Sequence, residues 1–447
     1  MRITTYTHIA ILITGLLLIN INAHGQEKIE LSLDEAVAIA LKSNWQIKMT
    51  ETKLGMAKSD LMKANSSFLP NVNISETFIS TTDPLNVFGF KLKQEIVSSA
   101  DFNPIVLNNP EAFDNFTTRI QVEQPIINLD ALTGRSAASS AVKASELNLV
   151  WTKNLITLKA KYFYFHLQLA NKKKEVLESS QKALKENFRV TQNLFDQGLV
   201  QKVDVLDMEL RMTELESQLL AMETQINDIN LQFTHFLGYE ITTKIALTDT
   251  IQNFTEIPLE NSSQGISINR SDLQALSLQL KASDKMLNSS KMSFLPRLNA
   301  FGSYEWNDNK VFGTSANNYF IGAKLQWDLF KGGKNIGKLQ KMKYQRNLMQ
   351  IRYDEKLSDS QRELVKIKNQ LLLSKKQLEL AELTVRQAKE VYKIKSDRYE
   401  EGLEKTADIL QSEAILLSKK LNLLQRINQY QQLIFNLELL LEKEITK

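Results

Sequence analysis

The pattern of apolar and polar positions changes its period several times along the chain. Over residues 44–67 and 270–293 apolar side chains recur three and four positions apart, as on one face of a helix, and both stretches end at a Phe-Leu-Pro sequence. Proline cannot continue a helix, so Pro70 and Pro296 are predicted helix-to-strand boundaries. Alternation of apolar and polar residues then indicates strands. The four predicted strands are about residues 70–80, 116–127, 297–306 and 318–330.

Two much longer stretches combine helical periodicity with few glycine or proline residues. They cover about residues 136–238 and 335–443, and each is interrupted near its middle by a glycine turn, at Gly198 or Gly402. Each stretch is therefore predicted to be a long helical hairpin whose glycine takes the left-handed conformation after a helix end. In the second stretch large residues recur at sevens, which is typical of coiled-coil packing. These are Leu357, Leu364, Leu371, Leu378, Val385, Tyr392 and Tyr399.

The chain is a tandem duplication. The segment Phe-Asp-Gln-Gly-Leu-Val-Gln-Lys-Val-Asp-Val-Leu-Asp at 195–207 returns as Tyr-Glu-Glu-Gly-Leu-Glu-Lys-Thr-Ala-Asp-Ile-Leu-Gln at 399–411, and the Phe-Leu-Pro sequence also occurs once per half. We expect a first structural repeat over residues 26–268, with a linker at its end, and a second over residues 269–447. The predicted fold is mainly α with a small β part, in the order strand, strand and long helical hairpin, twice.

Composition excludes several classes of function. The 447 residues include no cysteine and 4 histidines, and the formal net charge of +4 is small against 55 basic and 51 acidic residues. Disulfides, thiolate chemistry, a metal site and an electrostatic nucleic-acid surface are therefore not indicated. Residues 1–25 have a basic start, a short apolar run and small residues near the end, which predicts a secretory signal peptide. We expect an exported protein without cofactors and without enzymatic activity.

The predicted strands carry aromatic residues, among them Tyr304, Trp306 and Tyr319, which favour the interfaces of an outer membrane. Four strands cannot close a barrel, and open edges are not tolerated in hydrocarbon. The chain is therefore expected to form oligomers that share one barrel.

These features together resemble the TolC-like outer-membrane efflux protein family over essentially the whole mature chain. The resemblance rests on the two Phe-Leu-Pro boundaries, the aromatic pair Tyr162-Phe163, and the paired turns that lead from Gly198 to Asp204 and from Gly402 to Asp408. It implies a homotrimer with a 12-stranded outer-membrane β-barrel continuous with a periplasmic α-helical barrel. It also implies the outer membrane of a Gram-negative bacterium as location, and a periplasmic adaptor and an inner-membrane pump as partners.

The same resemblance implies where a gate would lie. In the family the periplasmic tip carries acidic rings, and the matching residues here are Asp204, Asp207, Asp408 and Tyr399. The resemblance further implies adaptor docking at the turns formed by Gly198, Leu199, Gly402 and Leu403. The chain departs from the family's best-known lock at Glu404, where an arginine is expected; Lys202 and Lys405 are nearby candidates to replace it. Asp204 and Asp408 also fit a helix N-cap, because each follows a glycine turn.

The expected function is passive conduction of substrates, delivered by the adaptor and pump of a tripartite efflux or type I secretion system, across the outer membrane. The alternative is a periplasmic coiled-coil adaptor, which would have one hairpin rather than two. The connection at 81–115 is much longer than its counterpart in the second repeat and contains Pro84, Pro104 and Pro110, so we expect an elaborated surface loop there. Its role and the exported substrate are not indicated by the sequence.

Overall fold

The computed structural model describes residues 28–249 and 269–443, so the predicted signal peptide and most of the linker lie outside the described residues. The chain forms two compact units. Unit 1 comprises Met1–Lys48, Thr152–Ile266 and Arg362–Lys447, and unit 2 comprises Met49–Trp151 and Ser267–Gln361. Each unit thus takes segments from both sequence repeats.

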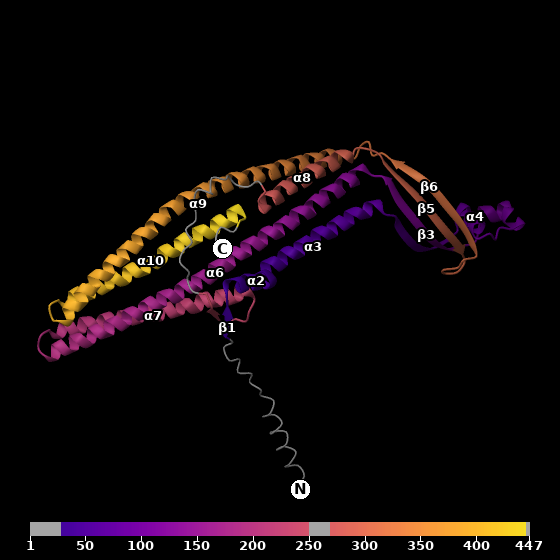
Figure 1. The fold of residues 1–447 in the computed structure, drawn as a ribbon. Coiled ribbons are helices and arrows are strands. Elements are labelled where there is room, and N and C mark those ends of the chain that lie inside the picture. Colours follow the sequence, from indigo (N-terminus) through magenta and orange to yellow (C-terminus); the bar gives the residue numbers. More distant parts are fainter. Residues whose placement is uncertain (1–27, 250–268, 444–447) are drawn as a thin grey trace, which may run out of the picture. The chain divides into compact units, whose positions relative to one another are not determined.

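Unit 2 is organised around a four-stranded antiparallel sheet with the order β2-β3-β5-β6 (Figure 1). The strands are β2 (Asn71–Thr81), β3 (Phe113–Ile127), β5 (Arg297–Asp308) and β6 (Ala316–Gln326). Helix α3 (Trp45–Asn65) leads through the short η1 (Ser66–Phe68) into β2, and α8 (Ser271–Met292) leads into β5. The two predicted boundary prolines stand directly before these strands, as expected from their inability to continue a helix.

Strand lengths agree with the predicted ranges to within a few residues, and one difference has a simple cause. The alternating pattern of β6 continues to Leu329 in the sequence, but the strand ends at Gln326. Gln326 pairs with Arg297, the first residue of β5, and Pro296 before it has no N–H to continue the ladder. The partner strand therefore sets the end of β6.

The connection between β2 and β3 is folded rather than irregular. It contains α4 (Pro84–Lys93), the short η2 (Ser99–Phe102) and α5 (Pro104–Asn108). Both helices begin with proline directly after a capping residue, because Asp83 accepts from the Asn86 N–H and Asn103 from the Ile105 N–H. Proline is favoured at the first helical position, so two of the prolines that indicated a loop instead begin helices.

Unit 1 contains the two helical hairpins. They are formed by α6 (Leu129–Asp196) with α7 (Lys202–Leu237) and by α9 (Lys334–Glu400) with α10 (Thr406–Leu441); the first residues of α6 and α9 belong to unit 2. The first long helix starts seven residues earlier than predicted, and Gly134 lies inside it. Figure 1 shows α7 beside α6 and α10 beside α9. Within residues 28–249 and 269–443, no helix has both the length and the apolar character needed to cross a membrane.

A parallel pair of short strands and a helix complete unit 1. Strand β1 (Lys28–Leu31) pairs with β4 (Lys244–Leu247), and α2 (Leu33–Ser43) follows β1. The Tyr164 hydroxyl of α6 lies 3.2 Å from the Leu31 carbonyl and 2.9 Å from the Asp249 carboxylate, so it ties the pair to the hairpin. Burial, with the Asp249 contact, raises the pKa of Tyr164 to about 12. The hydroxyl therefore stays neutral and remains a hydrogen-bond donor at physiological pH.

Two apolar clusters hold the hairpins together. One joins α6, α9 and α10 and includes Phe165, Leu371 and Phe435. The other joins all four hairpin helices and includes Leu184, Met208 and Tyr399. Leu364, Leu371, Leu378 and Tyr399 from the row of sevens are buried, and so are the smaller Ser360, Ser374 and Ala381 near them. Small residues beside large ones let the helix backbones approach closely, as in a coiled coil.

Candidate functional site

The sheet of unit 2 has one face that is apolar and open. Because the cross-strand partners lie on the same face, the register places Ile74 of β2, Ile120 of β3, Tyr304 of β5 and Tyr319 of β6 on it. Ile74 is 68% exposed and Ile321 is 78% exposed, although both are large apolar side chains. The face also carries Val72, Phe78, Phe116, Val122, Trp306, Ala323 and Leu325. An apolar surface of this extent marks contact with lipid or another apolar partner.

The opposite face of the same sheet is predominantly polar and carries charges. Arg119 of β3 donates to Glu305 of β5 at 2.7 Å, and Asn299 donates to Glu123 at 3.0 Å. Further polar side chains on this face are Asn71, Asn73, Ser75, Thr77, Thr81, Asn115, Thr117, Gln121, Arg297, Ser303, Asn307, Asn318, Lys324 and Gln326. A sheet with one apolar and one polar face, neither of them covered over most of its length by the part of the chain that the structure describes, fits the wall between lipid and water.

The tips of the two hairpins in unit 1 have the same geometry. Gly198 has φ +74° and Gly402 has φ +72°. The Leu199 N–H donates to the Leu194 carbonyl and the Leu403 N–H to the Arg398 carbonyl, each at 2.9 Å. This is the closing bond pattern of a helix that ends at a left-handed glycine, as the sequence predicted. Leu199 and Leu403 are both exposed, so each tip presents a leucine to its surroundings.

The predicted gate residues lie near these tips in different settings. The N-cap residues of α7 and α10 are Gln201 and Lys405, so the expectation that Asp204 and Asp408 are N-caps is wrong. Asp204 instead lies in the first turn of α7 and accepts from the Gln201 N–H at 2.9 Å, and Asp408 lies 3.4 Å from the Lys395 ammonium group of α9. Asp207 is exposed on α7. Tyr399 is 1% exposed; its hydroxyl lies 2.6 Å from the Thr191 hydroxyl of α6 and 3.2 Å from that of Thr406. Within a single copy, Tyr399 therefore links the two hairpins, while the three aspartates remain on the surface or at its margin.

Glu404, the position that departs from the expected arginine, has basic partners on the preceding helix. The Arg398 guanidinium donates to its carboxylate at 2.9 Å and to the Leu403 carbonyl at 3.1 Å. Lys395 lies 3.9 Å from the same carboxylate. These contacts fasten the second turn to its own helix, and both cations come from α9.

A buried polar cluster between the hairpins was not predicted. Glu413 of α10 is 3% exposed, yet it accepts from the Arg211 guanidinium of α7 at 2.9 Å and from the Ser180 hydroxyl of α6. The sequence contained a signal, because Glu413 lies four residues after Ile409 and three before Leu416, on the apolar face of its helix. An acidic residue at such a position requires a buried partner, but the partner is 202 residues away in the sequence.

Further polar links lie closer to the tips. The Asn187 amide of α6 donates to the Tyr392 hydroxyl of α9 at 3.2 Å. Burial raises the pKa of Tyr392 above its ordinary value, so this hydroxyl also stays neutral near pH 7. Together with Thr191, Tyr399, Ser180 and Glu413, these residues form a polar ladder between the two hairpins. Polar contacts in an otherwise apolar interface fix its register, because a shift leaves them unpaired.

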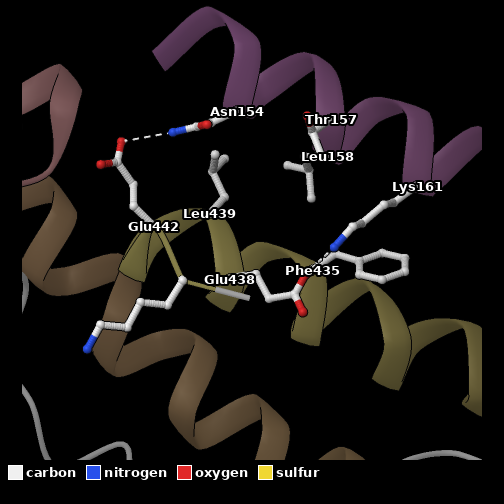
Figure 2. A pocket seen from close by; sticks show the side chains of 9 residues that line it. Asn154, Thr157, Leu158, Lys161, Phe435, Glu438, Leu439 and Glu442 are labelled. Atoms are coloured by element: carbon white, nitrogen blue, oxygen red, sulfur yellow. Dashed lines mark hydrogen bonds and ion pairs between the residues drawn. The ribbon is translucent and has the colours of Figure 1, made fainter. Parts of the chain in front are cut away.

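A pocket of about 210 Å³ lies between α6 and α10 (Figure 2). Lys161 reaches across it to Glu438 at 3.0 Å and lies 5.8 Å from the centre of the Phe435 ring, while Asn154 donates to Glu442 at 3.3 Å. The lysine and the glutamate neutralise each other, and no nucleophile and base face one another among the side chains in the view. The pocket is therefore a packed junction between two helices rather than a reaction centre.

The fold and these surfaces define a class of protein: a chain with a strand sheet that suits a boundary between lipid and water, and with paired long helical hairpins. The sequence matches the family described as outer membrane efflux protein over residues 36–239 and 263–441. The chain belongs to this family. Its location is the outer membrane, and the family and its fold are those of channels rather than enzymes or adaptors.

Similar proteins come from several bacteria. The chain is 19% identical over 316 residues to the alkaline protease secretion protein AprF of Pseudomonas aeruginosa, covering 68% of this chain and 65% of AprF. The solved outer membrane protein VceC of Vibrio cholerae is similar with a TM-score of 0.78 at 16% identity, covering 93% of this chain and 97% of VceC. The CmeC outer membrane channel of Campylobacter jejuni gives 0.76 at 17%, covering 92% and 85%. At these identities the structures establish the fold.

Proposed function

We propose that the protein is the outer-membrane channel of a tripartite efflux or type I secretion system, working as a homotrimer with a periplasmic adaptor and an inner-membrane pump. The observation that carries the proposal is the two-faced sheet. One copy offers four strands whose outer members, β2 and β6, end the sheet on either side. Unpaired edges are not stable in hydrocarbon, and three copies of four strands close a 12-stranded barrel.

The direction of the strands supports closure by copies of the same chain. Neighbouring strands in the sheet are antiparallel throughout, so β6 runs opposite to β2. A β6 strand from one copy can therefore pair antiparallel with β2 of the next, which is the arrangement of outer-membrane barrels. The apolar face then meets lipid and the polar face lines a passage through which substrates move passively.

The tips supply the proposed gate. Asp204, Asp207 and Asp408 lie near the two glycine turns, and threefold assembly would repeat each of them around one axis. Rings of carboxylates favour cations and disfavour anions. The exposed Leu199 and Leu403 at the turns are the proposed docking points for the adaptor, because a solvent-exposed leucine at a rigid turn gives an apolar contact of defined position.

Purification in detergent followed by light scattering and planar-bilayer recording tests the proposal. We expect a trimer that conducts ions with a preference for cations. Replacing Asp204 and Asp408 by alanine should weaken this preference, since six carboxylates would be lost from the trimer, whereas Asp228→Ala, an exposed site further along α7, should leave it unchanged. A monomer that stays in solution without detergent would refute the channel, and unchanged selectivity in the double variant would remove the two aspartates from the gate.

A further inference from the structure

The connection between β2 and β3, residues 82–112, is a compact helical element that we call the insert. Lys91 of α4 pairs with Asp101 at 2.7 Å, and Asp101 also accepts from the Ser98 N–H at 2.7 Å. The Phe88 and Phe102 rings meet edge to face at 5.5 Å between centroids. Contacts between its first and second halves hold the insert in one conformation, which a loose surface loop would not have.

The insert is anchored on the polar face of the sheet. Gln94, 5% exposed, donates to the Asn115 side chain at 2.8 Å, and Asn115 in turn donates to Asn307 at 3.2 Å. Lys93 lies 3.5 Å from Glu305, the residue that also pairs with Arg119. All the sheet residues in these contacts belong to the polar face.

The shorter connection between β5 and β6 is instead anchored on the apolar face of the sheet. The Phe312 N–H donates to the Glu76 carboxylate at 3.2 Å, and Glu76 is bound by the Thr118 hydroxyl. Glu76 and Thr118 both lie on the apolar face. The two connections at this end of the sheet, which Figure 1 shows at the end away from α3 and α8, therefore fold toward opposite faces. The insert is on the side that the proposed channel uses as its passage.

The insert also carries apolar side chains that are largely exposed in one copy. Leu85 is 81% exposed, Ile105 is 76% exposed and Phe102 is 61% exposed. Exposing such residues to water is unfavourable, and their burial against an apolar partner is favourable. A lumen shared by three copies offers the partner, because a 12-stranded barrel lies in size between eight-stranded barrels, which side chains fill, and porins of about 16–18 strands, which leave an aqueous channel. Three helical inserts, each helix about 10 Å wide, would meet in a 12-stranded lumen.

We infer that the insert is a plug: three copies project into the passage from its polar wall, pack against one another through Leu85, Phe102 and Ile105, and narrow the outer mouth of the channel. This inference rests on the proposed trimeric channel. In the trimer, the exposed apolar surface of each insert is covered by the same surface of the other two inserts. The plug restricts what enters from outside, and it must move or deform when a large substrate leaves.

Cysteine cross-linking tests the contact between copies. The chain has no cysteine, so Ile105→Cys introduces a single thiol per copy. We expect mild oxidation of the trimer to give a disulfide-linked dimer on a non-reducing gel. Val311→Cys is the matched control, because Val311 is 58% exposed at the same end of the sheet but on the connection that folds toward the apolar face. It should not cross-link. An Ile105→Cys trimer that stays uncross-linked while a bulky maleimide labels every thiol would overturn the plug.

Conductance tests what the plug does. Thr81 pairs with Phe113, so the strands on either side of the insert are close enough for a short turn to join them. Replacing residues 84–110 by a short Gly-Ser turn should raise single-channel conductance several-fold with the trimer intact. A second variant, Lys93→Ala with Gln94→Ala, removes the anchors only and should give a higher or fluctuating conductance, whereas Glu111→Ala, exposed in the same insert, should not.

The two hypotheses fail in different ways. A wild-type protein that forms conducting trimers, with both insert variants at wild-type conductance, overturns the plug and leaves the channel. A wild-type protein that forms no trimer overturns both.

Discussion

At the scale of single residues, the most consequential side chains are charged groups buried between leucines. Glu413 accepts a hydrogen bond from Ser180 and pairs with Arg211, which is itself only partly exposed. Taking a carboxylate out of water costs several kcal/mol, so each partner is required by the others. Because the three residues come from α10, α6 and α7, they determine how the two hairpins fit together within one copy.

Arg211→Met therefore leaves Glu413 as a buried charge without its cation. We expect a loss of about 3–5 kcal/mol in the free energy of unfolding of the helical unit. The matched control is Arg189→Met, because Arg189 pairs with Glu186 at the surface and both are more than half exposed. Its effect should stay below about 1 kcal/mol. Chemical denaturation followed by circular dichroism at 222 nm measures both. Equal stabilities for the two variants would show that the buried pair does not hold the hairpins.

At the scale of elements, the alternation of apolar and polar residues gives each strand one side suited to lipid and one side suited to water. Ile74 and Ser75 are neighbours on β2, yet the first lies on the apolar face and the second on the polar face. A slip of one residue in register would turn every apolar side chain toward water. The Phe301 ring packs on Gly322 of β6, where a Cβ atom would come within 2.7 Å of it. Register is therefore fixed by packing on the sheet as well as by the pattern.

Ile74→Arg should strongly impair assembly in the outer membrane, because an arginine on the lipid face costs about 2–4 kcal/mol per copy near the bilayer midplane. Ser75→Arg, one residue away, should assemble normally, because it faces the passage. Heat-modifiable trimers in outer-membrane fractions, resolved by gel electrophoresis, measure assembly. Equal yields of the two variants would show that the sheet does not separate lipid from water.

At the scale of the whole molecule, one copy is incomplete. The sheet stops at β2 on one side and at β6 on the other, and most of the large side chains on its apolar face are exposed. Exposed edges recruit further strands, and natural proteins avoid this by closure. In the proposed trimer, assembly would complete the membrane part of the fold.

Paired cysteines test this closure. Each variant combines Ser75→Cys on β2 with a second cysteine on β6, at Asn318, Phe320 or Lys324. We expect one of the three pairs to form disulfides between copies and so to give linked dimers and trimers. Gln121→Cys with Ser303→Cys is the control: these residues are direct partners on β3 and β5, so their disulfide should form within one copy. Absence of intermolecular products at every tested position, beside an efficient control, would mean that β6 and β2 of neighbouring copies do not meet.

The sequence by itself determined the elements that depend on local rules. Period two predicted all four strands, Pro70 and Pro296 marked where helices give way to strands, and the glycines at 198 and 402 marked turns that need positive φ. The duplication supplied the order of elements. The prolines of the insert were misleading, because proline both breaks helices and begins them, and the capping residues Asp83 and Asn103 were the signal that distinguishes the two.

Only the tertiary structure decided which distant segments meet. The partner of Glu413, the side of the sheet on which the insert lies, and the cations that hold Glu404 all depend on packing between elements or on the geometry of a closed turn. The periodicity of the sequence does not identify these contacts. A charge or an amide at a buried position shows that a partner is needed, but not where in the sequence the partner lies. Hydrophobic pattern fixes what each segment becomes, whereas the pairing of polar groups is settled only when the segments are brought together.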